Sequence, residues 1–253
     1  FQIKLDYWKQ SANRQVPPTI RQTSSSAYQL DGADRVVLGL KTAIGLWLIE
    51  GKASYMNERL DYFDPVIVLS SPSSIKTRFS KAEAQRHFGD LKIHIGLEGR
   101  NNQAEAIGYR DDYVEQNYQA VFSKLSYNRQ NWRAEFSMRQ GRFNNQWIPL
   151  IPAADFQYGK MGKWLIFAGY SGQYRIPSLN ELYWRPGGNQ ELSPEHGWSA
   201  ELGTKKYLNF GDEMRSQIQL NGFYRNVDNW LQWTLPEGGS IFQALNINEI
   251  TSY

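Results

Sequence analysis

Apolar and polar residues alternate with a period of two along most of this chain. In 164–170, one face carries Trp164, Ile166, Ala168 and Tyr170. In 131–140, Trp132, Ala134, Phe136 and Met138 oppose Arg133, Glu135, Ser137 and Arg139. Successive side chains of a strand point to opposite faces, so each segment predicts a β-strand that is apolar on one side and strongly polar on the other. Helical spacing is scarce, and the pattern therefore indicates an all-β fold.

The connections between these segments alternate in length. About twelve strands are predicted, at 1–9, 34–41, 43–57, 74–88, 90–98, 115–127, 131–140, 149–158, 163–173, 197–207, 214–226 and 243–253. Short turns are predicted near 42 and 89 and at 128–130, 159–162 and 208–213. Longer connections are predicted at 10–33, 58–73, 99–114, 141–148, 174–196 and 227–242. Short turns at one end and long loops at the other are typical of membrane β-barrels.

Composition supports the same class. Aromatic residues make up 14% of the chain, although its mean hydropathy is only −0.60. A wet lumen and two aromatic girdles give a membrane barrel this combination. No run approaches 18 apolar residues, which excludes helical membrane spans. We therefore predict an antiparallel up-and-down transmembrane β-barrel, with a soluble β-sandwich or barrel of similar strand count as the alternative.

Residues 170–203 carry a set of ordered motifs. Tyr174-Arg-Ile-Pro177 ends a predicted strand, and Glu181-Leu-Tyr-Trp184 follows. Gly188-Asn189, Leu192-Ser-Pro194-Glu195 and Glu201-Leu-Gly203 come next. This set resembles the signature of TonB-dependent outer-membrane receptors. The resemblance implies a barrel of about 22 strands around a plug domain, of which residues 1–253 would be a partial barrel without the plug and the closing strands.

Most motif residues are expected to hold a rigid loop. Pro177 lacks an N–H and ends ladder pairing, and Pro194 keeps Ser193 extended. The run Gly187-Gly188-Asn189 favours positive φ in a tight turn. A structural role is predicted for Arg175, Pro177, Glu181, Asn189, Pro194, Glu195, Glu201 and Gly203. Ligand contacts are predicted in the loops 10–33, 58–73, 174–196 and 227–242, with Trp184, Arg185, Trp230 and Trp233 as candidates.

The resemblance also implies a function. The segment Arg14-Gln-Val-Pro-Pro-Thr19 with Gln22-Thr23, and the segment Trp184-Arg-Pro-Gly-Gly-Asn189, are similar to the cobalamin-receptor branch of the family. The implied protein is an energy-coupled uptake receptor of the bacterial outer membrane, for cobalamin first and an iron–siderophore complex second. Its implied partners are membrane lipid, the nutrient, and the TonB complex through an N-terminal region that is missing here, with room for a surface lipoprotein. A structural or adhesion barrel is the alternative.

Other chemistry has little support in the sequence. There is no cysteine, no Gly-x-Ser-x-Gly and no phosphate loop, and we predict neither an enzyme nor a bound cofactor. A net charge of +3 spread along the chain does not favour nucleic acid. Two acidic pairs in predicted loops, Asp61 with Asp64 and Asp111 with Asp112, offer oxygen ligands for calcium, although solvated loop acids are the simpler interpretation.

Overall fold

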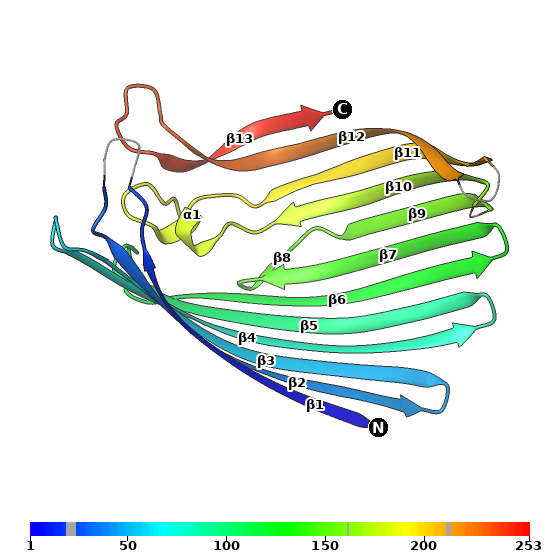
Figure 1. Cartoon of the computed structure of the whole chain (residues 1–253), viewed down its shortest axis with the longest axis horizontal. Coiled ribbons are helices and arrows are strands. Elements are labelled where there is room, and N and C mark those ends of the chain that lie inside the picture. The colour runs from blue at the N-terminus through cyan, green and yellow to red at the C-terminus, as the bar shows by residue number, and fades with distance from the viewer. Residues whose placement is uncertain (19–23, 161, 211–213) are drawn as a thin grey trace.

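The computed structural model describes residues 1–18, 24–160, 162–210 and 214–253. The first seven strands are β1 (Gln2–Gln15), β2 (Tyr28–Ile44), β3 (Trp47–Asp64), β4 (Leu69–Phe88), β5 (Leu91–Ala106), β6 (Val114–Arg129) and β7 (Trp132–Phe143). The later elements are β8 (Gln146–Trp147), β9 (Ile151–Lys160), β10 (Trp164–Arg175), α1 (Leu179–Tyr183), β11 (Glu195–Phe210), β12 (Met214–Thr234) and β13 (Gln243–Ser252). Figure 1 shows these elements in one continuous sheet.

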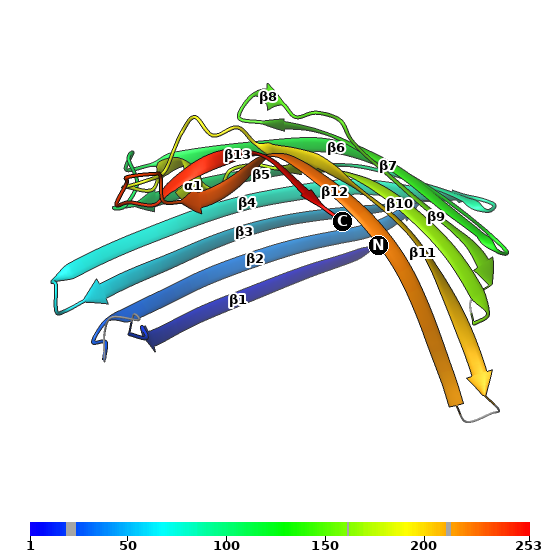
Figure 2. The ribbon, with the colours of Figure 1, turned by 90° about the horizontal axis from the view of Figure 1, so that it is seen from above.

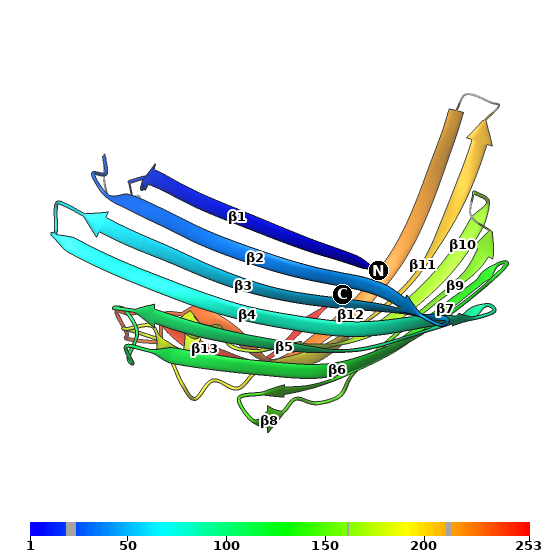
Figure 3. The ribbon, with the colours of Figure 1, turned by 90° about the horizontal axis from the view of Figure 1, so that it is seen from below.

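The sheet is antiparallel, and its strands follow one another in sequence order. It has 13 strands, of which only the two-residue β8 lies off the main path, where it pairs with β7. Figures 2 and 3 show that the sheet curves into a trough. No ladder joins β1 to β13 within the described ranges, so the trough is open. This is the predicted all-β, up-and-down architecture, as an unclosed part of a barrel wall.

The register places one apolar face along the whole sheet. Ile3, Leu5 and Tyr7 of β1 lie opposite Leu40, Leu38 and Val36 of β2. The same face continues from Leu97 to Val121, from Leu125 to Phe136, and from Ala168 to Leu202. Many of these side chains are exposed although they are large and apolar. A contiguous apolar surface of this extent marks a face that contacts lipid, and we call it the outer face.

Two bands of exposed aromatic residues border the apolar part of the outer face. The turn-end band, near the short turns, consists of Phe88, Tyr127, Trp132, Tyr158 and Trp164. The loop-end band, nearer the long connections, consists of Tyr7, Tyr55, Tyr170, Trp198 and Tyr224. Trp198 lies 6.0 Å from Tyr170 and 5.3 Å from Tyr224, measured between ring centroids. Paired aromatic girdles of this kind mark the two membrane interfaces of a barrel.

The opposite, inner face is polar and laced with ion pairs. Lys41 Nζ lies 2.6 Å from Glu50 Oε1, and Lys124 Nζ lies 2.5 Å from Glu135 Oε2. Arg139 forms a further ion pair with Glu98. Pairing neutralises side chains that project into a shared space. The inner face is therefore built for water and solutes, as the lumen of a barrel requires.

The structure corrects the strand lengths at the loop end. Large parts of the predicted loops 10–33, 58–73, 99–114, 141–148 and 227–242 belong to strands, and the turn after β3 is only residues 65–68. Polar residues occupy both faces there, so the alternation disappears although the ladder continues. Along β5, for example, Leu97 is followed by Asn101, Asn102 and Gln103. The strands have left the lipid, and their outer face no longer needs apolar side chains.

The short turns lie close to their predicted places, although the one predicted near 42 is at 45–46. Residues 19–23, 161 and 211–213, which include Thr19, Gln22 and Thr23 of the cobalamin-like segment, lie outside the described residues. In the described part of the chain, no helix is long and apolar enough to cross a membrane.

Candidate functional site

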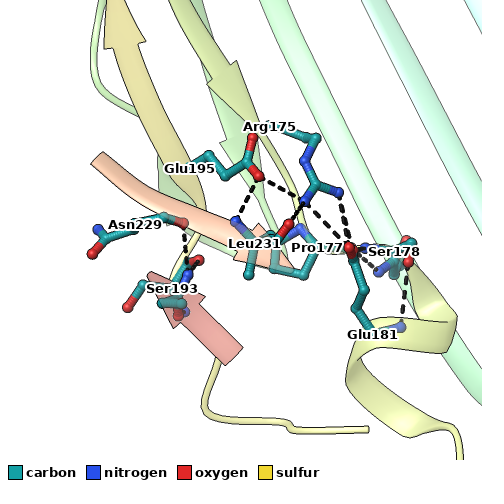
Figure 4. A network of polar contacts seen from close by, with 10 residues as sticks. Arg175, Pro177, Ser178, Glu181, Ser193, Glu195, Asn229 and Leu231 are labelled. Atoms are coloured by element: carbon teal, nitrogen blue, oxygen red, sulfur yellow. Dashed lines mark hydrogen bonds and ion pairs between the residues drawn. The ribbon is translucent and has the colours of Figure 1, made fainter. Parts of the chain in front are cut away.

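A buried polar network joins the motif residues at the loop end of β10 (Figure 4). Arg175, the last residue of β10, donates from Nη1 to both carboxylate oxygens of Glu181, at 3.1 Å each. Its Nη2 donates to Glu195 Oε1 at 2.7 Å. The Leu231 N–H donates to the same Glu195 oxygen at 2.7 Å, and the Leu231 carbonyl accepts from Arg175 at 3.4 Å. One guanidinium thus links β10, α1, β11 and β12.

The two carboxylates of this network are buried, with Glu181 8% exposed and Glu195 7% exposed. A buried carboxylate is costly unless it is paired and hydrogen-bonded. Arg175 supplies the opposite charge to both, and backbone N–H groups supply the remaining donors. Because each partner depends on the others, we infer that the network has a single arrangement in the folded chain.

Helix α1 begins with a capping box. Ser178 is the N-cap, and its side chain accepts from the Glu181 N–H at 3.3 Å. Glu181 Oε2 in turn accepts from the Ser178 N–H at 2.7 Å. This reciprocal pair satisfies two otherwise free donors of the first turn. Glu181 therefore starts the helix and closes the ion pair with Arg175, which fixes the entry of α1 relative to β10.

The glycines after α1 are needed for close approach. Gly187 has φ +115°, and a Cβ there would lie 2.1 Å from the Phe242 carbonyl oxygen. A Cβ on Gly188 would lie 2.6 Å from the backbone N and O of Trp184. Of the predicted run Gly187-Gly188-Asn189, only Gly187 has positive φ. Asn189 accepts from the Glu191 N–H at 2.9 Å with its side chain, as in an Asx turn.

The α1 segment is also tied to the connection between β5 and β6. The Tyr109 hydroxyl donates to Asn180 Oδ1 at 2.7 Å, and Gln116 donates from Nε2 to the buried Pro177 carbonyl at 3.2 Å. Burial raises the pKa of the Tyr109 hydroxyl, which keeps it protonated as a donor. These contacts hold α1 against strands that lie far from it in the sequence.

The candidates Trp184 and Arg185 lie beside Tyr109. Trp184 is 39% exposed and packs edge-on to the Tyr109 ring, with centroids 6.3 Å apart. Its indole fills the space that a Cβ on Gly108 would occupy. Arg185 is exposed and donates to the Arg110 carbonyl. Both residues thus lie at the loop end, where a solute would meet them, and both also have structural contacts.

Trp230 and Trp233 lie on β12, in different surroundings. The guanidinium of Arg225 lies 5.8 Å from the ring centroid of Trp230. Trp233 packs on a cluster of buried apolar residues, namely Leu182, Leu192, Leu231 and Ala244. It therefore braces α1, and its contact with ligand remains a prediction.

Three other motif residues shape β11. Pro194 precedes Glu195, the first residue of that strand. Gly203 is buried. A Cβ at this position would lie 2.3 Å from Cζ of Phe167 on β10, so there is no room for a larger side chain. Glu201 is exposed and lies across the ladder from Gly169, whose missing side chain leaves room for it. These residues fit β11 to its neighbours and do not touch the Arg175 network.

The inner face is hollowed beside the network. This hollow is lined by Glu98, Arg100, Tyr118, Arg139, Tyr174 and Arg175, among others. A second hollow at the loop end is lined by Gln10, Arg14, Gln29, Asp31, Arg35 and Glu58, with Tyr109 at its border. The first offers cations and phenols to a solute, and the second offers cations, amides and the phenol of Tyr109. Strand residues line both hollows. The loops in which ligand contacts are predicted therefore contain only part of the polar surface.

The four calcium candidates do not form one cluster. Asp64 accepts from the Val66 N–H at 2.9 Å in the turn after β3, and Asp111 accepts from Gln190 at 3.3 Å. Asp61 and Asp112 line one shallow hollow that also contains Arg59. Within the described ranges, no group of three or more His, Cys, Asp or Glu side chains is placed to hold a metal ion. Calcium binding stays a prediction.

Sequence reasoning did not find the partners of the motif. Leu231 lies 36 residues from Glu195, Tyr109 lies 71 residues from Asn180, and Asn246 lies 53 residues from Ser193. Asn246, for example, accepts from the Ser193 N–H and donates to the carbonyls of Ser193 and Asn229. The alternating pattern of a strand does not indicate which distant group an asparagine or tyrosine side chain will bind.

A curved antiparallel wall with one lipid-facing side, one wet side and two aromatic bands defines an outer-membrane β-barrel protein. The model of the family described as "TonB dependent receptor-like, beta-barrel" matches residues 5–253. The chain belongs to this family, whose members are proteins of the bacterial outer membrane.

Curated and solved relatives agree with this assignment. A vitamin B12 transporter, BtuB, of Photobacterium profundum is 26% identical over 209 residues, which are 74% of this chain and 32% of the relative. The hemophore receptor HasR of Serratia marcescens, solved with its hemophore and heme, superposes with TM-score 0.79 and 14% identity. The siderophore receptor PirA of Pseudomonas aeruginosa gives TM-score 0.75 and 14% identity. The chain spans about half of each solved structure, 48% of HasR and 52% of PirA. Each of the two matches covers 98% of this chain.

Proposed function

We propose that this chain forms wall and rim of an energy-coupled receptor that takes up a scarce nutrient complex, with cobalamin as the first ligand and an iron–siderophore complex as the second. The observation that carries the choice is the 26% identity to a vitamin B12 transporter over 74% of the chain. The solved relatives include receptors for heme and siderophores, which supports a nutrient complex as the class of ligand.

The geometry offers a mechanism for selective binding that involves no chemical reaction of the ligand. The Arg175 network holds α1 rigidly, and Trp184 and Arg185 lie at its end. Large aromatic and amide side chains on a rigid support give broad contact at small entropic cost. Solute that passes this rim next meets the charged hollows of the inner face. No catalytic step belongs to the proposal, and the driving energy comes from the TonB complex at the other side of the membrane.

The test is ligand binding by the complete reading frame that encodes this chain. Outer membranes from cells that express it are incubated with radiolabelled cobalamin, and unlabelled cobalamin or a ferric siderophore is added as competitor. Cobalamin alone should displace the label. Specific binding of a ferric siderophore that carries radioactive iron, measured separately and without specific binding of cobalamin, would favour the second ligand. Expression without binding of either would favour the structural or adhesion barrel.

A pair of variants links this binding to the rim. Trp184→Ala removes an exposed indole and should weaken cobalamin binding about tenfold, as expected for the loss of one aromatic contact of roughly 1.4 kcal/mol. Trp132→Ala is the matched control because Trp132 lies in the turn-end band of the outer face. Equal losses in both variants would indicate general destabilisation and would contradict the rim assignment.

A further inference from the structure

Two lysines flank Trp164 at the turn end of the outer face. In the ladder, Trp164 lies directly opposite Lys160 of β9 on one side and Lys206 of β11 on the other. Both lysines are exposed, Trp164 is 37% exposed, and neither lysine forms an ion pair with a described residue.

The turn between β9 and β10 brings Lys160 and Trp164 into register, with Lys206 on the other side of Trp164. Gly159 has φ +134° and Gly162 has φ +81°, which lets the backbone turn within a few residues. The Lys163 N–H donates to the Lys160 carbonyl at 3.0 Å, and the Lys163 carbonyl accepts from the Tyr207 N–H at 3.0 Å. Directly opposed residues on one face have Cβ atoms about 5 Å apart, so two flexible lysine stems beside the indole can reach a common anion.

The surroundings of this lysine pair are apolar on one side only. Farther along the same face, Ile166 lies opposite Tyr158, and Ala168 lies opposite Phe156 and Leu202. A ligand there would meet an apolar surface next to two cations, with the Trp164 ring at the boundary. This arrangement is complementary to a phospholipid, whose acyl chains lie in the apolar band and whose phosphate lies at the interface.

The same edge repeats the pairing of a cation with an aromatic ring, although more weakly. Arg86 lies 4.4 Å from the ring centroid of Phe88, and Arg129 lies opposite Trp132 in the ladder. Arg129 is partly neutralised, since Asp90 Oδ2 lies 3.5 Å from its Nε. The pair Lys160 and Lys206 is distinguished by having two cations without such a counter-ion among the described residues.

From this juxtaposition we propose that Lys160 and Lys206, with Trp164, form a binding site for the headgroup of an anionic phospholipid in the leaflet at the turn end. The site recognises net negative charge on a lipid, because two ammonium groups favour an anionic over a zwitterionic headgroup. It is separate from the inner face, so it holds the barrel wall in its lipid and takes no part in uptake of the nutrient.

The test counts lipids bound to the full chain, folded in neutral detergent micelles, by native mass spectrometry. Phosphatidylglycerol should bind more tightly than phosphatidylcholine, and added salt should weaken the first more than the second. The double variant Lys160→Gln with Lys206→Gln should weaken phosphatidylglycerol binding about 30-fold, the factor that two surface lysines contribute against an anionic membrane. Each single variant should lose about fivefold.

Lys205→Gln is the matched control, because it removes the same charge one residue away on the opposite face of β11. It should leave lipid binding unchanged. Equal loss in Lys205→Gln, equal binding of the two lipids, or displacement by inorganic phosphate at the same concentration as the lipid would each overturn the proposal. Far-UV circular dichroism of every variant confirms that a β-fold was measured, and the single variants and the salt dependence of the natural chain decide if the double variant does not fold.

Discussion

The wall formed by β1–β5 and the corner formed by α1 and β10–β13 are stabilised in different ways. From Gln2 to Ala106, the only buried apolar side chains among the described residues are Ala27 and Ala104. The corner, in contrast, buries Leu179, Leu182, Leu192, Val227, Leu231 and Ala244. The wall depends on its backbone ladder and on lipid, whereas the corner has a protein core with an ion network. The corner should therefore respond to mutation as a soluble domain does, and the wall should respond to changes of its membrane face.

The largest effect is expected from Arg175→Met in the corner. This change leaves two buried carboxylates without a counter-charge, and loss of one partner of a buried pair costs about 3–5 kcal/mol. The lower end applies because the Arg175 side chain is 42% exposed. The measurement is urea unfolding of the chain in detergent micelles, followed by tryptophan fluorescence.

Arg133→Met, on the inner face of β7 and outside the corner, provides the contrast. Its ion pair with Glu135 is 3.1 Å long, and its side chain is 56% exposed. The expected cost is about 0–1 kcal/mol because exposed pairs contribute little. Similar losses of unfolding free energy for Arg175→Met and Arg133→Met would show that the corner network contributes no more than an exposed ion pair.

The next effect concerns the lipid face of the wall. Leu97→Arg places a charge on the outer face between the two aromatic bands, where cations cost about 2–4 kcal/mol near the bilayer midplane. Folding into lipid bilayers, measured by resistance to urea, should fall accordingly. Asn101→Arg, four residues toward the loop end on the same face and in one ladder row with Tyr55 of the loop-end band, should cost much less. If both variants fold equally well, the limits of the apolar band are wrong.

Gly203→Val tests packing between neighbouring strands. The added side chain would collide with the Phe167 ring, and overpacking costs about 1–3 kcal/mol. Unfolding midpoints of Gly203→Val and of the double variant with Phe167→Ala should show partial rescue in the double variant. An additive loss would argue against direct collision between the two side chains.

Within the corner, the smallest effect is expected at the helix cap. Ser178→Ala removes the acceptor for the Glu181 N–H and should destabilise the corner by about 1 kcal/mol. Limited proteolysis within 176–194 should become faster, while cleavage in the wall stays the same. Ser178→Asp retains an acceptor and should behave like the natural chain; cleavage as fast as in Ser178→Ala would contradict the capping role.

Strand direction and face were predictable from sequence because lipid on one side and water on the other impose strict alternation. The predicted strand 163–173 is β10, 164–175, and the predicted strand 131–140 is β7, 132–143. Beyond the membrane this constraint ends. Segments such as Ser70-Ser71-Pro72-Ser73-Ser74 read as loop, yet they belong to β4, because ladder partners on β3 and not their own side chains keep them extended.

The motif residues were recognisable, but their partners were not. Arg175, Glu181 and Glu195 lie within 21 residues of one another in a set of spaced motifs, which made them visible. Leu231 contributes through its backbone, so its side chain gives no clue to its place in the network. The role of Tyr109 likewise depends on how the connection between β5 and β6 meets α1.

Strands β3 and β4 extend well past the loop-end band. From Tyr55 in the loop-end band, β3 runs nine further residues to Asp64, about 30 Å along the strand. The hairpin tip at 65–68 therefore stands clear of the headgroups on a stiff support, at the far left of Figure 1. An antibody or a phage would reach this tip before any other part of β3 or β4, and a short epitope inserted there should be displayed on living cells without disturbing the part of the wall that contacts lipid.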